Sequence, residues 1–288
     1  IIKIIEGDTT IGFFPLYIDK KNRLRFINDV NADFCDIILS KKIDLYYLFQ
    51  FILNDCNQKR IQLINLKENS ILLQFKSSNY KIICSVFEKY TELQVDKGIF
   101  PNNCNKLLYK ERGEIRRINK KNVNIQHKLL NINQADFPIK EILELKKKMI
   151  QDGIRNNDFL PLNQLNLIEN LYKNNQLEIS LTKDSKIRAI LFIITNRNNS
   201  LLWIDLYDKN SYTSTLYNYI SYISVKSFDS DICINFGRGA YKWKMSKFRP
   251  DVGDLFRLNI FSNNWFYVNH IINSYIIDTL TFIYRRFK

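Results

Sequence analysis

The sequence predicts a mixed α/β (α+β) protein made of two similar halves, each a mostly antiparallel sheet flanked by helices. Strand patterns at Leu177–Lys183, Ile187–Thr195 and Leu201–Tyr207 are separated only by short polar turns, which is typical of an antiparallel meander. A helical pattern at Ser211–Lys226 then leads into a further strand, Asp231–Phe236. A strand, a helix and a strand in this order form a crossover to a parallel neighbour. The first half repeats the same order of elements more loosely.

The first half contains shorter patterns. Polar residues Lys20-Lys21-Asn22 join its first two strands, as expected of a turn. The predicted strands are Thr10–Asp19, Arg23–Asn28, Ile61–Leu66 and Tyr80–Phe87, and the predicted helices are Asp33–Ser40, Asp44–Asn54 and Asn69–Ser77.

Three further helices are predicted in the second half. Asp136 is placed to cap the first, which ends at Gly153, and the second starts near Pro161. The third, Trp265–Lys288, is amphipathic and ends in cations that suit a helix C-terminus. We expect it to pack on the second domain, with a membrane surface as the alternative. Its predicted apolar stripe is Ile272, Tyr275, Ile276, Leu280 and Ile283.

These patterns predict a first domain over residues 1–105, a basic connecting helix over 106–125 and a second domain over 126–288. The chain opens at Ile1 without Met, so we leave open that a segment precedes it. Within the connecting helix, Arg116 and Arg117 are candidates for binding an acidic polysaccharide, a lipid headgroup or tRNA. The alternative is a solvated linker helix.

Composition narrows the class of protein. Hydrophobic residues make up 45% of the 288 residues, which argues against disorder, and no window has the roughly 18 uninterrupted apolar residues of a membrane span. The net charge of +14 favours anionic partners, although a lysine-rich coding bias would have the same effect. Nothing in the sequence points to DNA.

The cysteines and histidines exclude several chemistries. Five scattered cysteines without a C-x-x-C pair predict neither a metal site nor a disulfide framework, and they favour a reducing, cytoplasmic compartment. With only His127 and His270, a Ser-His or Cys-His mechanism is not expected.

The segment Asp231–Lys244, DICINFGRGAYKWK, is the most informative part of the chain. A strand runs into Gly237 and Gly239, where the backbone can turn tightly or approach a ligand closely. Aromatic and basic side chains follow at the carboxyl end of the strand, where ligands usually bind in open α/β sheets. The alternative is an ordinary turn into a helix.

The chain resembles the cellulose-biosynthesis (CelD-like) acyltransferases of the GNAT superfamily. The resemblance rests on the run DICINFGRGAYKWK, on the order of elements and on the basic segment KERGEIRRINKK. Phe13-Phe14-Pro15-Leu16 and Arg25-Phe26-Ile27 extend the resemblance into the first half. Fem-type aminoacyltransferases are related and share the doubled fold. The resemblance implies tandem GNAT-like domains, with the active site in the second and a degenerate first domain.

The resemblance also implies a site. The pantetheine arm of acyl-CoA, as co-substrate, would enter between Leu201–Tyr207 and Asp231–Phe236, and Tyr241 would be the general acid. One departure leaves the donor open: residues 208–215 contain no glycine, where a phosphate-binding loop is expected. A helix N-terminus can still bind phosphate there, or Ser211 is merely the cap. The implied donor-binding residues are Tyr207, Ser211, Thr213, Asn235, Gly237, Arg238 and Gly239.

Asp205 is the candidate general base. Strand alternation places it on one face with Trp203 and Tyr207, and Leu202, Ile204 and Leu206 on the other. Burial would raise the pKa of this carboxyl and suit it to proton transfer. The alternative is a structural ion pair with Arg238 or Lys242. The candidate substrate-binding residues are Lys242, Trp243, Trp203, Arg116 and Arg117.

We therefore expect a cytoplasmic, bacterial N- or O-acyltransferase. Peripheral contact with the inner face of the membrane is left open. It would move an acyl group, such as acetyl, from acyl-CoA to an amine or hydroxyl of a saccharide or cell-envelope (exopolysaccharide) precursor. Two alternatives remain open: a Fem-type aminoacyltransferase using aminoacyl-tRNA, and a degenerate GNAT domain that only binds.

Overall fold

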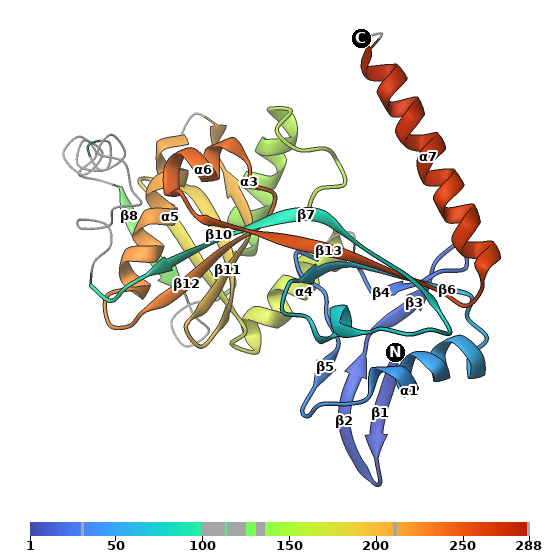
Figure 1. Cartoon of the computed structure of the whole chain (residues 1–288). Coiled ribbons are helices and arrows are strands. Elements are labelled where there is room, and N and C mark those ends of the chain that lie inside the picture. The colour runs from blue at the N-terminus through green and yellow to red at the C-terminus, as the bar shows by residue number, and fades with distance from the viewer. Residues whose placement is uncertain (30–31, 99–112, 114–124, 131–135, 210–211, 287–288) are drawn as a thin grey trace. The chain divides into compact units, whose positions relative to one another are not determined.

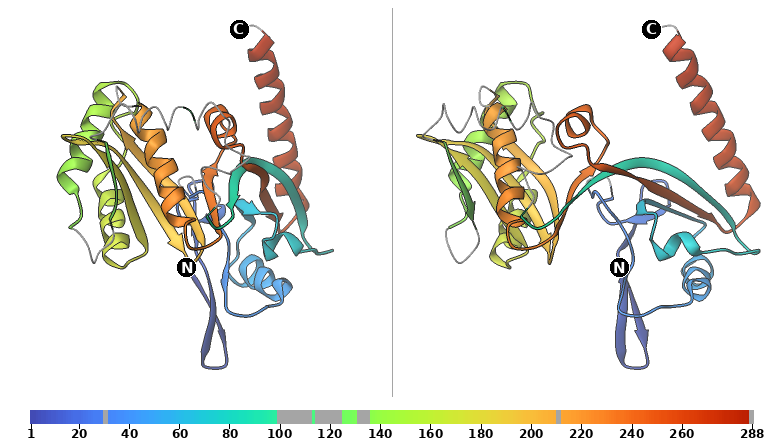
Figure 2. Two further views of the ribbon diagram at one scale, coloured as in Figure 1. Left: turned by 90° about the vertical axis from the view of Figure 1, so that its left-hand side faces the viewer. Right: turned by 60° about the vertical axis from the view of Figure 1, so that its left-hand side comes forward.

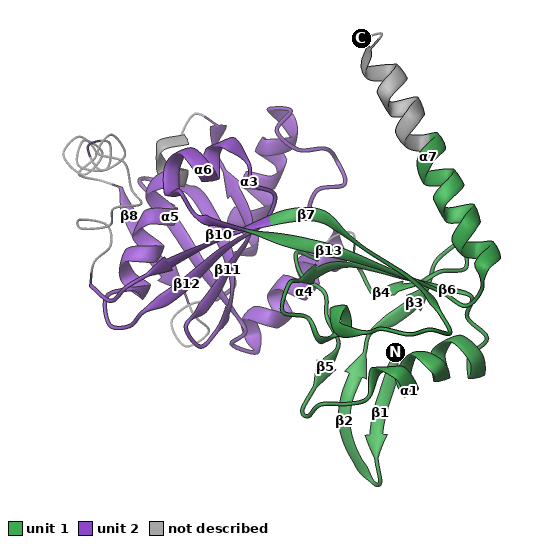
Figure 3. Cartoon of the chain, in the orientation of Figure 1, with its two compact units in different colours: residues 1–89, 253–288 green, residues 90–252 purple. Residues whose placement is uncertain are grey.

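The computed structural model describes residues 1–29, 32–98, 113, 125–130, 136–209 and 212–286. The chain divides into two compact units (Figure 3). Unit 1 comprises Ile1–Lys89 with Gly253–Lys288, and unit 2 comprises Tyr90–Val252. The C-terminal segment therefore belongs to the same unit as the N-terminus, a division different from the sequence-based boundaries at 105 and 126. Nearly all of the predicted connecting helix 106–125 lies outside the described residues.

Unit 2 is built on a mixed sheet in which, among the described residues, β11 and β12 are the one parallel pair of neighbours. The predicted meander and the crossover helix are both confirmed (Figure 1). The sequence analysis missed β8 and the second part of β7, which closes the other edge of β12. In spatial order the strands are β7 (Lys81–Val95, in this unit from Tyr90), β12 (Ile232–Arg238), β11 (Asn199–Tyr207), β10 (Ile187–Asn196), β9 (Leu177–Lys183) and β8 (Gln126–Leu130).

Helices cover both faces of this sheet (Figure 2). On one face α3 (Ile139–Gln151) and α4 (Leu162–Lys173) bury their apolar stripes against β9 and β10. On the other face α5 (Tyr212–Lys226) packs mainly on β9 and β10, and the short α6 (Lys242–Phe248) packs through Phe248 on Phe236 of β12. The N-cap of α3 is Pro138 and not Asp136.

Unit 1 has a separate core. Its larger sheet has the order β3, β4, β6, β13 and the first part of β7, and a small three-stranded sheet adjoins it. The bounds are β1 Ile2–Glu6, β2 Thr9–Phe14, β3 Leu16–Ile18, β4 Leu24–Phe26, β5 Ile38–Leu39, β6 Arg60–Lys67, β13 Asp251–Phe261, α1 Leu45–Gln50 with a π-helical turn Phe51–Asp55, a 3₁₀ turn Ile71–Gln74, and α7 Asn264–Arg286.

Two predicted helices of the first half are wrong. The segment Asp33–Ser40 is irregular and contains β5, because its polar groups bond to the protein around it instead of to a helix. The Cys35 N–H donates to the Asn65 carbonyl, and the side chain of Asp36 accepts from the next backbone N–H. The second, Asn69–Ser77, shortens to the single 3₁₀ turn, which Ser70 caps.

Helix α7 is present as predicted, but the described part of its predicted apolar stripe is largely exposed. Ile272, Tyr275 and Ile276 are 52%, 74% and 48% exposed. The contacts of the helix run through Tyr267 and His270, whose rings pack on Phe261 of β13 within unit 1. Among the described residues, no helix has both the length and the apolar character needed to cross a membrane.

A buried polar seam joins α5 to the sheet of unit 2. The Ser180 hydroxyl donates to Asn218 Oδ1 at 2.6 Å and lies 2.8 Å from His127 Nε2. Because the hydroxyl proton is used by Asn218, the imidazole must donate through Nε2 and cannot act as a base on Ser180. Ser180 is also fully buried, so this pair is structural and not a nucleophile with its base.

Burial lowers the pKa of His127 from 6.5 to about 4. The folded protein therefore keeps the imidazole neutral at a pH where the unfolded chain protonates it. The resulting stability is present above pH 6.5 and is lost as the pH falls toward 4. We expect the unfolding free energy of the wild type to fall by about 2 kcal/mol more than that of His127→Gln between pH 7 and pH 5. Chemical denaturation at both pH values measures this, and parallel losses would contradict it.

Candidate active site

The parallel pairing of β11 with β12 stops after three residue pairs. Asn199 lies opposite Cys233, Ser200 opposite Ile234, and Leu201 opposite Asn235. Past Leu201, β11 continues to Tyr207 against β10, while β12 bends at Gly237, whose φ is +73°. The facing edges of two neighbouring strands are therefore left unpaired near their carboxyl ends. The two strands part where the sequence predicted that a donor would enter.

The glycine-containing loop after β12 is held by side-chain contacts. The Asn235 side chain accepts from the Gly237 N–H at 2.7 Å and donates to Glu92 at 2.6 Å. Its amide is thus engaged within the protein. Gly239 has a φ of +82°, and a Cβ atom there would lie 2.5 Å from ring carbons of Tyr241. Only glycine lets the Tyr241 ring lie against this backbone.

Lys244 stabilises this loop, and the sequence analysis missed it. It is 5% exposed, and its ammonium donates to the carbonyl oxygens of Phe236 at 2.6 Å, Arg238 at 2.9 Å and Gly239 at 3.1 Å. The same nitrogen lies 5.0 Å from the centre of the Tyr241 ring. One cation thus bonds three carbonyls of the loop and makes a cation–π contact with the Tyr241 ring.

Tyr241 and its neighbours differ in exposure. Tyr241, the N-cap residue of α6, is 57% exposed, so its ring is largely open to solvent. Lys242 is exposed and Arg238 half-buried. Trp243 is 38% exposed and packs edge-on against Tyr219, Phe236 and Phe248, which makes it part of the aromatic wall of unit 2.

Asp205 lies on β11 with a hydrogen bond from Tyr219 of α5. Its ion-pair partner is Arg155, at 3.6 Å, and not Arg238 or Lys242 as the alternative prediction held. Burial raises the pKa of this carboxyl, while Arg155, Tyr219 and Lys244 oppose the rise. Burial and the adjacent carboxylate raise the pKa of Tyr219 well above 10, so its hydroxyl stays a donor. The side chain of Asp205 keeps 24% of its surface exposed, which leaves it accessible to an acceptor.

A β-bulge in β11, two residues before Asp205, interrupts the alternation of side chains along this strand. Phe192 lies opposite Ile204 and Ile193 opposite Leu202, so Trp203 is an extra residue in β11. Leu202 consequently packs on the α5 side and Leu206 on the α3 side. The predicted common face of Leu202, Ile204 and Leu206 is wrong, because the bulge changes the alternation.

The expected phosphate-binding stretch is described only in part. Ser211 lies outside the described residues, as do Arg116 and Arg117, and Thr213 lies in α5 with no side-chain description. At the start of the stretch, Asp208 is 2% exposed and pairs with Lys148 at 2.6 Å and Arg188 at 3.2 Å. Tyr207 is half-buried beside Tyr219.

Metal and thiol chemistry find no support in the described part of the chain. No three His, Cys, Asp or Glu residues there form a group able to hold a metal ion. Cys35, Cys56, Cys84 and Cys233 form no disulfide among the described residues.

Comparison with known proteins identifies the fold. No family model matches the chain, and no curated protein matches it significantly. Among solved structures, the C-terminal domain of a protein described as a lysylphosphatidylglycerol synthetase from Agrobacterium fabrum superposes with a TM-score of 0.62 at 11% identity, over 89% of this chain and 82% of that one. FemX gives 0.56 at 10% identity, over 88% and 86%.

A tandem GNAT protein from the clavulanic acid biosynthesis pathway gives a TM-score of 0.51 at 6% identity, over 91% of this chain and 82% of that one. These likenesses confirm the predicted fold, a tandem of GNAT-like domains in which mixed sheets are flanked by helices. The narrower CelD-like assignment is tested by none of them and stays a prediction.

Lys244 can be tested against its exposed neighbour Lys242. We expect Lys244→Met to lower the unfolding free energy by about 2–4 kcal/mol, because three buried carbonyls lose their donor. Lys242→Met should change it by less than about 0.5 kcal/mol. Urea denaturation of both variants measures the difference. Equal effects would mean that the three hydrogen bonds contribute nothing to the loop.

Proposed function

We propose that the protein is an acyltransferase that moves an acyl group from a carrier bound between β11 and β12 to an amine or hydroxyl of a saccharide or other cell-envelope precursor. The observation that carries the proposal is the early end of the β11–β12 ladder, with an accessible carboxylate on one strand and an exposed phenol after the other. The tandem GNAT fold supports it. We expect the reaction to take place in the cytoplasm, at the inner face of the membrane.

The unpaired strand edges suit the carrier and the reacting carbonyl. A pantetheine arm carries amide groups, which can pair with backbone N–H and C=O groups that no neighbouring strand uses. Backbone N–H groups at the same edge also stabilise the oxyanion that forms when the acyl carbonyl is attacked. Arg238, Gly237 and Gly239 border this edge and are the proposed donor contacts, together with Tyr207.

The chemistry follows from Asp205 and Tyr241. The acceptor nitrogen or oxygen attacks the acyl carbon, and its proton passes to the Asp205 carboxylate, directly or through water. The bond from the acyl carbon to the carrier sulfur then breaks, and the departing thiolate takes the proton of the Tyr241 hydroxyl. The Tyr219 hydrogen bond orients the carboxylate, and Arg155 limits the rise of its pKa. Trp243, Trp203 and Lys242 are the proposed contacts of the acceptor.

A charged tRNA is the second candidate donor. The stretch 208–215 lacks glycine, and the net charge is +14, as expected of a chain that binds a polyanion. FemX and the lysylphosphatidylglycerol synthetase domain are among the structural neighbours. In that case the bond that breaks joins the acyl carbon to a ribose oxygen, and Tyr241 protonates this oxygen.

Calorimetric titration separates the donors. Coenzyme A and acetyl-CoA should bind with a dissociation constant on the micromolar scale if the first candidate is right. If the second is right, coenzyme A is ignored and the affinity for aminoacyl-tRNA falls steeply as salt is added. A protein that binds neither donor would be a non-catalytic module, and the proposal would be wrong.

Tyr241→Phe tests the general acid. We expect turnover to fall about 10- to 100-fold with donor affinity unchanged, because the ring remains and only the proton donor is lost. Tyr47→Phe, at a 70% exposed tyrosine of unit 1, is the matched control and should leave turnover unchanged. Unchanged turnover in Tyr241→Phe would remove this residue from the mechanism.

Asp205→Asn tests the base through rate and stability together. Because the pKa of Asp205 is raised in the folded state, its ionised form costs stability at neutral pH, and the amide should stabilise the protein. Turnover should fall at least tenfold, and the decline of the wild-type rate at acid pH should disappear. A variant that is less stable yet fully active would instead identify a structural ion pair.

A further inference from the structure

Unit 1 contains a strongly basic sheet face that takes no part in the proposed reaction. Alternation along β6 and β13 sends Leu63, Leu258 and Ile260 into the unit 1 core. The residues between them point to the opposite face of the same strands. We name this opposite face the arginine face, and its members are Arg23, Arg25, Arg60, Gln62, Arg257 and Asn259.

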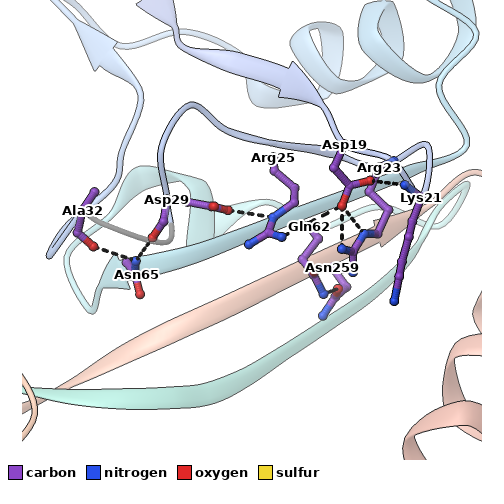
Figure 4. A network of polar contacts seen from close by, with 9 residues as sticks. All are labelled: Asp19, Lys21, Arg23, Arg25, Asp29, Ala32, Gln62, Asn65 and Asn259. Carbon is purple, nitrogen blue, oxygen red and sulfur yellow. Dashed lines mark hydrogen bonds and ion pairs between the residues drawn. The ribbon is translucent and has the colours of Figure 1, made fainter. Parts of the chain in front are cut away.

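The arginine face is compact because its strands are direct neighbours. Leu24 of β4 pairs with Ile61 of β6, so Arg23 and Arg25 lie beside Arg60 and Gln62. Gln62 pairs in turn with Asn259 of β13, to which it donates at 3.0 Å. The charges of Arg60, Arg257 and Arg23 all act on His270 of α7, so these three guanidinium groups lie around one side chain. Figure 4 shows Arg23, Arg25, Gln62 and Asn259 gathered on the arginine face.

Two of the four arginines are already neutralised. Arg23 binds Asp19 through Nε at 2.7 Å and donates to Gln62 at 2.8 Å. Arg25 donates to the buried carboxylate of Asp29 at 2.8 Å and lies 3.9 Å from Asp19. Two carboxylates therefore balance two guanidinium groups, and all four side chains are at most 16% exposed.

Arg60 and Arg257 are not neutralised. Among the described residues, neither has a carboxylate within ion-pair distance, and the Nε atom of each is buried without a hydrogen-bond partner. Each guanidinium lies over an aromatic ring, that of Arg60 at 5.5 Å from Phe261 and that of Arg257 at 4.4 Å from Phe87. The rings fix the guanidinium planes. Asp19 partly offsets the charge of Arg60 from a distance, whereas no carboxylate of the described residues acts on the charge of Arg257.

The neighbouring cations act unfavourably on the charged forms of the side chains of this face. Burial and the charges of Arg25 and Arg23 lower the pKa of Arg257, and burial with Arg23 lowers that of Arg60, while Asp19 opposes the fall. Burial and the arginines also lower the pKa of His270, whose Nδ1 lies 3.0 Å from Arg60. A half-buried site that gathers several cations is stabilised by an anion.

We propose that the arginine face binds a phosphate group, with Arg60 and Arg257 as its principal contacts and Gln62 and Asn259 as hydrogen-bonding neighbours. Guanidinium forks match the oxygen pairs of phosphate, and planar, pre-oriented arginines favour it over a point-like anion. The phosphate belongs either to a soluble phosphorylated compound or to the headgroup of an anionic lipid. The site lies wholly in unit 1, and the proposal does not depend on catalysis in unit 2.

Calorimetry with inorganic phosphate tests the site, with potassium chloride of equal ionic strength as the blank. We expect the wild type to bind phosphate and Arg257→Gln and Arg60→Gln to bind it at least tenfold more weakly. Arg257→Lys should also lose most of the affinity, because it keeps the charge but not the fork. Lys81→Gln, at an exposed lysine of β7, removes the same charge and should bind as the wild type does. Tyr241→Phe should bind normally whether or not the proposed reaction is correct.

The unfolding temperature without phosphate distinguishes a binding arginine from a structural one. Removing an uncompensated cation relieves repulsion, so Arg257→Gln should unfold at or above the wild-type temperature. A fall of more than about 5 °C, or phosphate binding that is equal in all variants or absent from the wild type, would overturn the proposal.

Vesicles of phosphatidylglycerol compared with vesicles of phosphatidylcholine identify the source of the phosphate. Arginine-dependent binding to the former assigns the phosphate to a lipid, and binding of inorganic phosphate alone assigns it to a soluble compound.

Discussion

The candidate site depends on one constraint, the end of the β11–β12 ladder after Leu201 and Asn235. A parallel pair that continued to Tyr207 would use the backbone groups of both strands and leave no room for a ligand. Gly237, with a positive φ, lies in the bulge of β12 where its pairing with β7 shifts. The ammonium of Lys244 donates to the carbonyls of Phe236, Arg238 and Gly239 around this bulge. The open gap and the buried lysine are therefore two parts of one arrangement.

The same arrangement places the two groups proposed for proton transfer. Asp205 projects from β11 and Tyr241 follows β12, so the carboxylate and the phenol belong to the two strands whose shared ladder ends early. Their environments differ, because Asp205 is partly buried beside Arg155 and Tyr219 while Tyr241 is largely exposed. A partly buried carboxylate suits the proposed base, which takes the proton of the acceptor. An exposed phenol suits the proposed acid, which protonates the leaving group.

The two units use the same kind of sheet for different chemistry. In unit 2 a polar site is made where strands part. In unit 1, β6 leads into Lys67 and a single 3₁₀ turn without glycines, so no comparable gap follows it. The polar residues of unit 1 instead gather on a sheet face, where Arg60 and Arg257 stack on rings and lack carboxylate partners in the described part of the chain. Anion recognition and group transfer are thus assigned to separate units.

The sequence by itself determined the second half. The alternation at Leu177–Lys183 and the GRGAYKWK run predicted the meander, the crossover and the position of Tyr241, since these follow from local periodicity and glycine placement. The tertiary structure decided the rest. The bulge at Trp203, the Arg155 partner of Asp205 and the three bonds of Lys244 join residues whose meeting no local pattern encodes. The return of β13 to unit 1 is also a long-range pairing, chosen by burial against β6 and not by propensity.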